Sequence, residues 1–417
     1  MLKGRFFYDN QNFFHLSCIQ STSLGLSGIV LGKKLAANYG AGTAICSIGI
    51  GNLILWLVAI AVISMADKFK GNAIDNIKEY LGKYGGMIAS LILMIAVLNW
   101  FAYQITFSMD AINNLIKGGI EDGMLIRIGA ALGLICSLLA LGGIHLLRKI
   151  TVFSFPLLIC YHLFAIFSAK QSVPIAGTWG LSFTAVTTSV LILLPGAINL
   201  PTFFRHSRSR AHSFLALTLM TLFITFFEVT TIWMEFSSFT VASTVLVTVF
   251  ILVILTYCNL VNIYLASASW ETFSSRFGEP KGFAIIGLFG TLTYTFVQVS
   301  TPVQFLQDLT NAYIATLGIV LLLAYLTRLI VRHRPRPLEK TINIATWLFG
   351  CLIATLYEVQ HFLKGTDALF AGINASLLFY MGTIFIEETL WAVKVRFSVR
   401  KVYRNNLKNR EFDKGAP

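Results

Sequence analysis

Long apolar runs dominate the sequence. Runs of roughly 17 to 25 mostly apolar residues, the length that a membrane-spanning helix requires, recur from one end of the chain to the other. We count twelve such runs and predict that each forms a transmembrane helix. Their centres lie near Leu26, Leu53, Ala96, Leu134, Leu158, Leu193, Leu222, Val253, Leu288, Ile319, Leu352 and Phe379.

Two of these runs carry residues that disfavour a helix near their middle. The run at residues 13–35 contains hydroxyl residues and glycines between Ser21 and Gly28, and the run at residues 180–204 contains Pro195 and Pro201. Freed backbone groups are tolerated in a bilayer only where protein buries them or they line a water-filled cavity. We therefore predict two broken helices around a transport site, with freed backbone groups at Ser21, Gly25, Gly28, Pro195 and Gly196.

The two predicted breaks divide the chain into halves of similar length. Residues 13–170 hold spans one to five, and residues 171–331 hold spans six to ten. Because five is an odd number, the second half must lie upside down relative to the first, as in the inverted repeats of secondary transporters. Residues 332–395 hold two further spans. No long soluble domain remains for a nucleotide-driven engine, so we expect a gradient to drive transport.

Composition and charge placement support a membrane protein of defined orientation. The chain is 56% hydrophobic and 12% charged, with a mean hydropathy of +0.73, which excludes a soluble protein. With residues 1–12 in the cytoplasm, the positive-inside rule also places the basic tail, residues 396–417, in the cytoplasm. Only six of the 32 Lys and Arg residues then lie on the outer side, namely Lys33, Lys34, Lys117, Arg127, Lys170 and Lys364.

The net charge of +13 therefore reflects topology, with contact to anionic membrane lipids as a secondary role, and no nucleic-acid partner is expected. Polar residues Asp9 to Asn12 follow the basic start of the chain, so we expect no cleavable signal peptide. The predicted location is the inner or plasma membrane, as a multi-pass protein that functions as a monomer.

The segment between spans two and three predicts a short separate helix. Residues 72–81 carry apolar side chains at Ile74, Ile77 and Leu81. This spacing is typical of an amphipathic helix that lies at the cytoplasmic interface.

Span three carries a pair of side chains suited to a flat ligand. Trp100 and Gln104 are four residues apart, so on a helix they share one face. A planar heteroaromatic ring can stack on the indole while the amide reads its donor and acceptor edge. The alternative is that Trp100 only packs and Gln104 bonds a neighbouring helix.

Span eight carries two amides, Asn259 and Asn262, three residues apart in hydrocarbon. An unsatisfied amide there is costly, so both need partners. The repeat makes span eight the counterpart of span three, and we expect both polar clusters to face the same cavity. Hydrogen bonding between helices is the alternative.

Glu228 lies well inside span seven. An ionisable group at this depth is a candidate functional group, for example a proton site, although a structural carboxyl is the alternative. The six cysteines lie in apolar segments without metal-ligand spacing, and no catalytic serine motif is present. We therefore expect no catalytic residue, no metal site, no organic cofactor and no enzymatic activity.

Several short motifs together resemble a known family. They are Leu31-Gly32, Ile50-Gly51-Asn52, Asn99-Trp100-Phe101, Asn199 to Arg205 and Asn262 to Ser267. Their order and spacing over the first 330 residues resemble, at low identity, the nucleobase-cation symporters. This family includes purine and cytosine permeases and hydantoin transporters, and belongs to the amino acid-polyamine-organocation superfamily.

This resemblance implies a ten-helix inverted-repeat core of the leucine-transporter type with two added C-terminal helices. It also implies a flat nitrogenous ring bound between a span-three aromatic side chain and span six, with amides from spans three and eight reading its edge. By position, Trp100, Gln104 and Asn262 would fill these roles, and Gln20 at the first break would add another amide.

The sequence departs from the family pattern in two places. Leu193 and its apolar neighbours stand where several members place an aromatic lid, so a stack on the ring would be one-sided. Sodium-coupled members combine carbonyl oxygens of the first span with small hydroxyls on span eight, and here only Thr256 is such a hydroxyl. The coupling ion is therefore Na⁺ or H⁺, with Glu228 as the proton candidate.

The sequence thus predicts a secondary active transporter that imports a nucleobase, such as cytosine or a purine, or a related small heteroaromatic compound. It would work by cation symport and alternating access. One alternative is an amino-acid permease on the same core, in which freed amides from Ser21 to Gly28 hold the substrate carboxylate. Another is a membrane sensor that does not transport.

Overall fold

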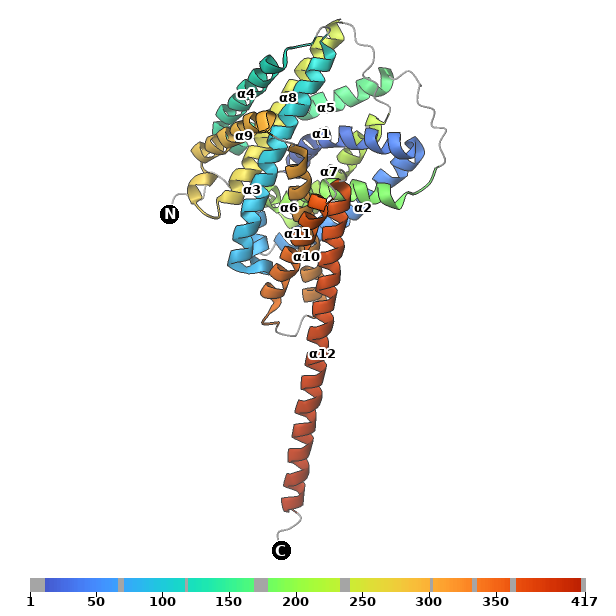
Figure 1. Ribbon diagram of the computed structural model, residues 1–417, viewed down its shortest axis with the longest axis vertical. Helices are drawn as coiled ribbons and strands as arrows, with labels where there is room; N and C mark the ends of the chain where they lie inside the picture. Colours follow the sequence, from blue (N-terminus) through green and yellow to red (C-terminus); the bar gives the residue numbers. More distant parts are fainter. Residues whose placement is uncertain are drawn as a thin grey trace.

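The computed structural model describes residues 12–66, 71–116, 119–168, 179–232, 241–300, 303–331, 336–360 and 365–413. Within these residues the fold is all-helical (Figure 1). The helices are α1 (Phe13–Tyr39), α2 (Ala41–Ala66), α3 (Ala73–Leu115), α4 (Asp122–Leu139), α5 (Gly143–Ser168), α6 (Phe183–Phe204), α7 (Arg210–Thr231), α8 (Val241–Trp270), α9 (Pro280–Ser300), α10 (Val303–Ile330), α11 (Glu339–Gln360) and α12 (Gly365–Asp413), with short 3-10 turns at Ala140–Gly142 and Ser275–Gly278.

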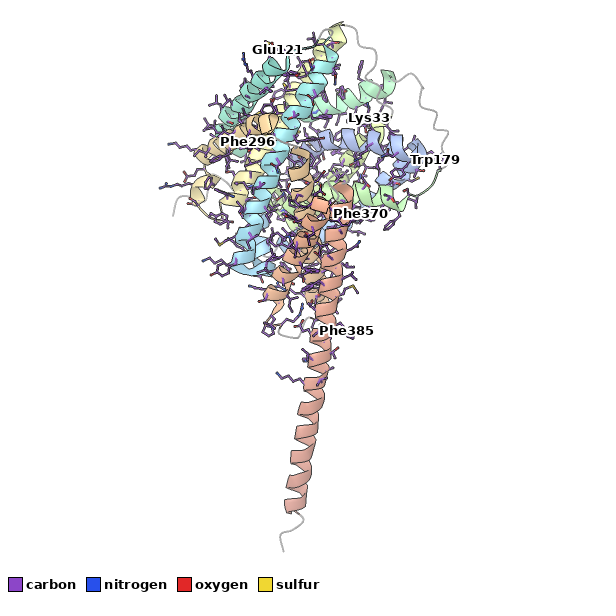
Figure 2. The ribbon with its side chains drawn as sticks, in the orientation of Figure 1. Lys33, Glu121, Trp179, Phe296, Phe370 and Phe385 are labelled. Atoms are coloured by element: carbon purple, nitrogen blue, oxygen red, sulfur yellow. The ribbon has the colours of Figure 1, made fainter. Side chains whose placement is uncertain are left out.

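The helices confirm the prediction of an all-α, multi-pass membrane protein. Among the described residues, nine helical stretches are long and apolar enough to cross a membrane, with α4 and α5 joined in one stretch, Asp122–Phe164. Large apolar side chains such as Trp179, Phe296 and Phe385 project outward (Figure 2), as expected of a surface that meets lipid. Because α1 and α9 are outside the set of nine, the number of twelve spans stays a prediction.

The prediction of a break in the first span is wrong. Helix α1 is continuous through Ser21, Gly25 and Gly28. Its hydroxyl side chains bond back to the preceding turn, for example from Ser21 Oγ to the Ser17 carbonyl at 2.7 Å and from Thr22 Oγ1 to the Cys18 carbonyl at 2.7 Å. These residues therefore satisfy the helix backbone and do not interrupt it.

The glycines of α1 serve close helix packing. A Cβ atom added at Gly28 would lie 3.1 Å from Glu228 Cγ on α7, and one at Gly32 would overlap the Glu228 carbonyl oxygen and the Thr231 hydroxyl. Gly28 and Gly32 thus form a small-xxx-small surface, the pattern that lets two membrane helices approach closely. Close packing of α1 on α7 follows from these two positions.

Helix α6 also stays continuous, although Pro195 and Pro201 lie inside it. The predicted unwinding at Pro195 and Gly196 is therefore wrong. Proline has no N–H, so the carbonyls four residues earlier, those of Leu191 and Ala197, lose their helical donors. What distinguishes α6 is two carbonyl groups without the usual helical donor in an otherwise continuous helix.

Among α1 to α9, the helix pairs that pack most extensively follow a regular scheme. Helix α1 packs on α7 and α2 on α6, while α3 packs on α8 and α4 on α9. In the predicted repeat, α1 corresponds to α6 and α2 corresponds to α7. The pair α1 and α7 therefore corresponds to the pair α6 and α2. This symmetric pairing is consistent with an inverted repeat, and the repeat itself stays a prediction. Helices α1, α2, α6 and α7 are called the bundle below, and α3, α4, α8 and α9 the scaffold.

The short helix predicted for residues 72–81 is confirmed as the first segment of α3. Asn72 caps it: its side chain accepts from the Asp75 N–H at 3.0 Å, and Asp75 accepts from the Asn72 N–H at 3.2 Å. The segment ends at Gly82, whose φ of 75° bends the chain and favours glycine. Ile77 and the other apolar positions of the segment are buried.

Ion pairs join the last three helices to one another and attach α10 to α3. Arg328 of α10 contacts Glu339 of α11 at 2.7 Å and Glu79 of α3 at 3.2 Å. Arg336 contacts Glu387 of α12 at 2.7 Å. Helix α12 then runs well beyond the other helices (Figure 1), so the described part of the predicted tail, up to Asp413, continues this helix. Residues 1–11 of the predicted cytoplasmic N-terminus lie outside the described residues.

Replacing Gly32 tests the packing of α1 on α7. Gly32→Ala is expected to destabilise the purified protein by about 1 to 3 kcal/mol, the usual cost of overpacking, and so to lower its melting temperature in detergent. Gly49→Ala on α2 is the matched control, because an added Cβ there meets nothing within 4 Å. Equal melting temperatures for the two variants would contradict the packing role of Gly32.

Candidate functional site

A cavity lies among α1, α3, α6, α8 and α10. Its volume is about 80 Å³, which is room for several water molecules. The described residues that line it include most of the predicted site residues and carry no charged side chain. They are Gln20, Ser23, Leu24, Ala96, Val97, Trp100, Gln104, Ile192, Leu193, Pro195, Gly196, Asn199, Val261, Asn262, Leu265 and Ile314.

Helix α3 presents Trp100 and Gln104 to this cavity from one face, as the spacing of four predicts. The indole Nε1 of Trp100 donates to Asn311 Oδ1 on α10 at 3.3 Å. The Tyr103 ring meets the indole edge-on, with centroids 5.8 Å apart. These two contacts fix the orientation of the indole plane. Trp100 is the one aromatic side chain among the described residues of the lining.

An amide pair joins α3 and α8 beside the indole. Asn262 Nδ2 donates to Gln104 Oε1 at 2.9 Å, so the two polar clusters predicted to meet do meet. Each amide carries two N–H donors and one oxygen acceptor. The pair therefore still offers donors at Gln104 Nε2 and an acceptor at Asn262 Oδ1, neither of which bonds another described residue. The interhelical bond and a free recognition edge coexist here.

Helices α1 and α6 complete the wall. Gln20 of α1, the amide that the family resemblance implies, is 4% exposed and lines the cavity, and Leu193 of α6 stands among apolar neighbours. Asn199 also lines the cavity, and its Nδ2 donates to the Pro195 carbonyl at 3.4 Å. Asn199 is a site residue that the sequence analysis did not assign. Its position in the sequence, an amide between Pro195 and Pro201 within an apolar run, could have identified it.

Two predicted residues of α8 do not line the cavity. The lining face of α8 is formed by Val261, Asn262 and Leu265. At 100° per residue, Asn259 lies roughly 110° from the centre of this face, and Thr256 roughly 170°. Asn259 is fully buried and its amide atoms have no partner among the described residues. The Thr256 hydroxyl donates to the Leu252 carbonyl of its own helix at 2.8 Å.

Two side chains of α8 donate hydrogen bonds to carbonyl groups of α1. Tyr257 donates its hydroxyl to the Ile19 carbonyl at 3.1 Å, and Cys258 lies with its sulfur 3.6 Å from the Ser23 carbonyl oxygen. Carbonyl oxygens that accept such bonds do not present a free set of cation ligands. Among the described residues, no three His, Cys, Asp or Glu side chains come together to hold a metal ion.

Glu228 of α7 lies apart from the main cavity and is 0% exposed. Its Oε2 accepts from Asn52 Nδ2 of α2 at 2.6 Å, and Asn52 also donates to Thr225 Oγ1 at 2.9 Å. The sequence-based prediction of a buried carboxyl at this depth is thus confirmed, and its role stays a prediction.

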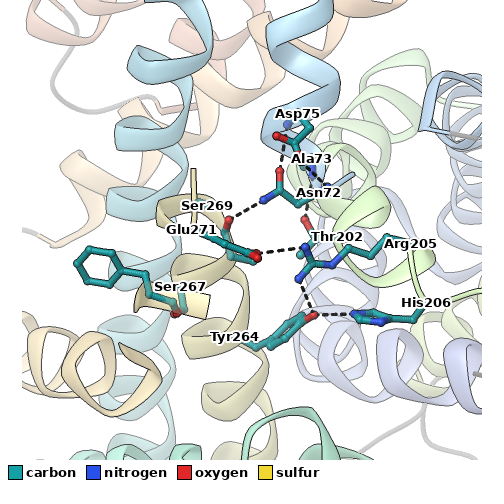
Figure 3. Close-up of polar contacts among 12 residues, drawn as sticks. Asn72, Ala73, Asp75, Thr202, Arg205, His206, Tyr264, Ser267, Ser269 and Glu271 are labelled. Carbon is teal, nitrogen blue, oxygen red and sulfur yellow. Dashed lines mark hydrogen bonds and ion pairs between the residues drawn. The ribbon is translucent and has the colours of Figure 1, made fainter. Parts of the chain in front are cut away.

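A polar network lies beyond the cavity, where the ends of α6 and α8 meet the start of α3 (Figure 3). Arg205 contacts Glu271 at 3.1 Å and donates to the Tyr264 hydroxyl at 3.2 Å, and His206 Nε2 lies 2.9 Å from that hydroxyl. Burial lowers the pKa of Arg205, but Tyr264 and Glu271 outweigh it and raise this pKa overall. Thr202 accepts from the Ala73 N–H at 3.2 Å.

This network, called the closing network below, joins the bundle to the scaffold. Arg205 follows Asn199 by six residues on α6, so it lies about 9 Å further along the helix axis. The network thus lies beyond the cavity on the side of the α3 N-terminus, where its contacts hold the end of α6 against α3 and α8.

Comparisons with known proteins were made by sequence and by structure. No protein-family model and no curated protein matches the sequence. Mhp1, a nucleobase-cation-symport-1 family transporter, in a closed conformation with bromovinylhydantoin bound, is 16% identical, with a TM-score of 0.63 over 92% of this chain and 94% of that chain. The inward-facing conformation of Mhp1 is also 16% identical, with a TM-score of 0.61 over 90% of this chain and 91% of that chain.

A third solved structure comes from a transporter of a different substrate. The substrate-bound outward-open state of a Na⁺-coupled sialic acid symporter is 12% identical, with a TM-score of 0.67 over 89% of this chain and 90% of that chain. The neighbours are transporters and not enzymes. The likeness to a nucleobase-cation symporter predicted from the sequence is confirmed as a likeness of fold. The chain therefore has the leucine-transporter-like helical fold that it shares with Mhp1 and the sialic acid symporter.

Proposed function

We propose that this chain is a secondary active transporter that imports a nucleobase, such as cytosine or a purine, or a related small heteroaromatic compound by cation symport. The observation that carries the proposal is the wall formed by Trp100 and the bonded pair Gln104 and Asn262. A flat ring that stacks on the indole brings its edge to the free Gln104 Nε2 donors and the Asn262 Oδ1 acceptor. An adjacent N–H and C=O on the ring would pair with both.

The character of the cavity favours a neutral ligand. Its described lining holds amides, one aromatic ring and apolar side chains, without a charged group. The amino-acid permease alternative needs freed backbone amides between Ser21 and Gly28, and α1 is a continuous helix there. The continuous helix therefore offers no freed amides to hold a substrate carboxylate there, which counts against that alternative. The fold of the solved neighbours, both of them transporters, favours transport over a sensor without transport.

Alternating access gives the closing network its role. The bundle carries Thr202, Arg205 and His206 at the end of α6, and the scaffold carries Tyr264 and Glu271 of α8 and Ala73 of α3. Movement of the bundle relative to the scaffold would have to break these contacts to open the cavity on this side. By the distribution of Lys and Arg this is the cytoplasmic side, in an inner or plasma membrane with both termini in the cytoplasm.

Uptake by proteoliposomes tests the proposed function. Purified protein is reconstituted and offered labelled cytosine, uracil, adenine or hydantoin, each with a sodium gradient, a proton gradient or no gradient, and with free amino acids as competitors. Accumulation of at least one ring compound under a cation gradient is expected. Binding without accumulation would favour a sensor, and competition by amino acids alone would favour the permease.

Trp100→Leu is expected to reduce uptake at low substrate concentration about tenfold or more. Stacking of a base on an aromatic side chain contributes about 1 to 3 kcal/mol, and each 1.4 kcal/mol corresponds to about a factor of ten in affinity. Trp391→Leu on α12, outside the cavity, is the matched control and should transport normally. Equal uptake by both variants would remove Trp100 from the site.

Asn262→Leu is expected to raise the half-saturating concentration about tenfold for a ring with adjacent N–H and C=O groups. The substitution removes one bonding partner and leaves Gln104 Oε1 without its donor, at a cost of about 1 to 3 kcal/mol. Asn259→Leu, on the same helix but away from the cavity, should leave this concentration unchanged. A larger effect from Asn259→Leu would contradict the assignment.

Tyr264→Phe is expected to open the closing network. It removes the hydroxyl that holds Arg205 and His206. In a background without native cysteines, a Leu265→Cys reporter in the cavity wall should react several-fold faster with an impermeant maleimide in inside-out vesicles. Tyr294→Phe on α9, outside the network, is the control, and equal reaction rates in the two backgrounds would count against a closing role.

A further inference from the structure

Glu228 is a carboxyl group buried inside the bundle. It lies on α7 and is 0% exposed. Its Oε2 atom accepts one short hydrogen bond from Asn52 of α2, and its Oε1 atom has no partner among the described residues. No ion pair joins Glu228 to a Lys, Arg or His within the described part of the chain. An ionisable group at this depth, without a cation partner and with one oxygen unsatisfied, is a candidate for proton exchange.

Among the described residues, the groups that face Glu228 do not titrate. They are Asn52 from α2, Thr225 and Thr231 of its own helix, and Gly28 and Gly32 from α1. Titratable groups do occur elsewhere on the helices packed here. Helix α5 places the ring of His162 against Phe227, with centroids 4.7 Å apart, and Lys33 follows Gly32 on α1. Proton exchange at this position therefore centres on the carboxyl itself.

A second, smaller cavity lies between the main cavity and Asn52, the donor to this carboxyl, although Glu228 itself lines neither cavity. It has a volume of about 30 Å³ and is lined by Asn52, the donor to Glu228. Leu24 of α1 and Leu193 of α6 line both cavities. These two leucines thus form part of the partition between the ring site and the Asn52 side of the carboxyl. A movement of either leucine on ligand binding would change the shape of both cavities.

Helix α1 provides a second mechanical link. Gly28 of α1 packs on the Glu228 side chain, and one to two turns earlier Gln20 and Leu24 of the same rigid helix line the main cavity. A charge gained or lost at Glu228 changes what α1 packs against, and α1 carries part of the ring site. Energetic coupling between two sites requires such an element, whose position both sites affect.

We propose that Glu228 is the binding site of the coupling proton, and that Asn52 is the residue that positions it. This rests on the proposed transport function and names its coupling ion. In the carboxylate form, a proton from water bonds to Oε1 while Oε2 keeps its bond from Asn52. Release breaks the same O–H bond and returns the proton to water on the other side, so no electrons are transferred and no second reactant is needed.

The surroundings favour a proton over a sodium ion. Asn52 turns its N–H group, and not its oxygen, toward the carboxyl. Because Glu228 Oε2 accepts this bond, only the other carboxyl oxygen, Oε1, is left as a ligand for a cation. The α1 carbonyls of Ile19 and Ser23, which would be candidate cation ligands, face the donors Tyr257 and Cys258 of α8. A Na⁺ ion needs several oxygen ligands at once, whereas a proton needs only Oε1.

Transport by the full-length protein in proteoliposomes gives the first test. With labelled cytosine as the probe, or whichever ring compound the wild type exchanges, Glu228→Gln should retain exchange of internal for external substrate but lose accumulation under an inward proton gradient. Glu228→Asp, which keeps a carboxyl, should retain accumulation at a reduced rate. Glu358→Gln is the matched control, because it removes another buried carboxyl, on α11 and outside the bundle.

Infrared spectroscopy gives a second test that does not depend on the substrate. A C=O stretching band of a protonated carboxyl should disappear as pH is raised in the wild type and in Glu228→Asp, and that component should be missing from Glu228→Gln but present in Glu358→Gln. The comparison of Glu228→Gln with Glu228→Asp also guards against misfolding of the glutamine variant.

The outcomes separate this proposal from the proposed function. Proton-driven accumulation by Glu228→Gln at the wild-type level, or wild-type accumulation that responds to sodium alone, would overturn the proton site and leave ring transport intact. If the wild type exchanges no ring compound, the proposed substrate class fails. In that case a titrating band assigned to Glu228 supports the proton site, and its absence overturns it.

Discussion

A bilayer offers no water to polar groups in its interior, so each such group must be satisfied by the protein or be reserved for a ligand. This constraint organises the molecule. The hydroxyls of α1 bond their own helix, Asn262 bonds Gln104 across two helices, and Asn52 bonds Glu228. Other buried polar atoms have no partner among the described residues, for example both amide atoms of Asn259. Two of the unsatisfied places, the amide edge in the main cavity and Oε1 of Glu228, are where we place the ligand and the proton.

The same constraint explains how one pair of residues can serve both fold and function. The bond between Gln104 and Asn262 joins α3 to α8, and each amide has hydrogen-bonding capacity left over. A ring that enters the cavity would complete this capacity and stack on an indole already oriented by Asn311 and Tyr103. Binding would then require little rearrangement of the site, which lowers its entropic cost.

Helical periodicity made part of this site predictable. Trp100 and Gln104 meet in the cavity because a spacing of four fixes a shared face, and the amide in span eight followed from the need for a partner. The prediction that Asn259 also faces the cavity was wrong. Residues three apart point about 60° apart around a helix, and only the packing of α8 decides which of them faces the cavity. The prediction of two broken helices was wrong because it rested on residues that disfavour a helix in isolation. In the protein, the hydroxyls of α1 bond the backbone of their own helix, and Gly28 and Gly32 allow α7 to pack closely.

The orientation of the bound ring tests the account most directly. A cryo-electron microscopy map of the full-length protein with bound cytosine, or with another ring compound shown to be transported, would reveal it. We predict a ring plane stacked on the Trp100 indole, with its N–H and C=O edge within hydrogen-bond distance of Asn262 Oδ1 and Gln104 Nε2. Ligand density outside this cavity, or a ring that contacts neither amide, would contradict the account.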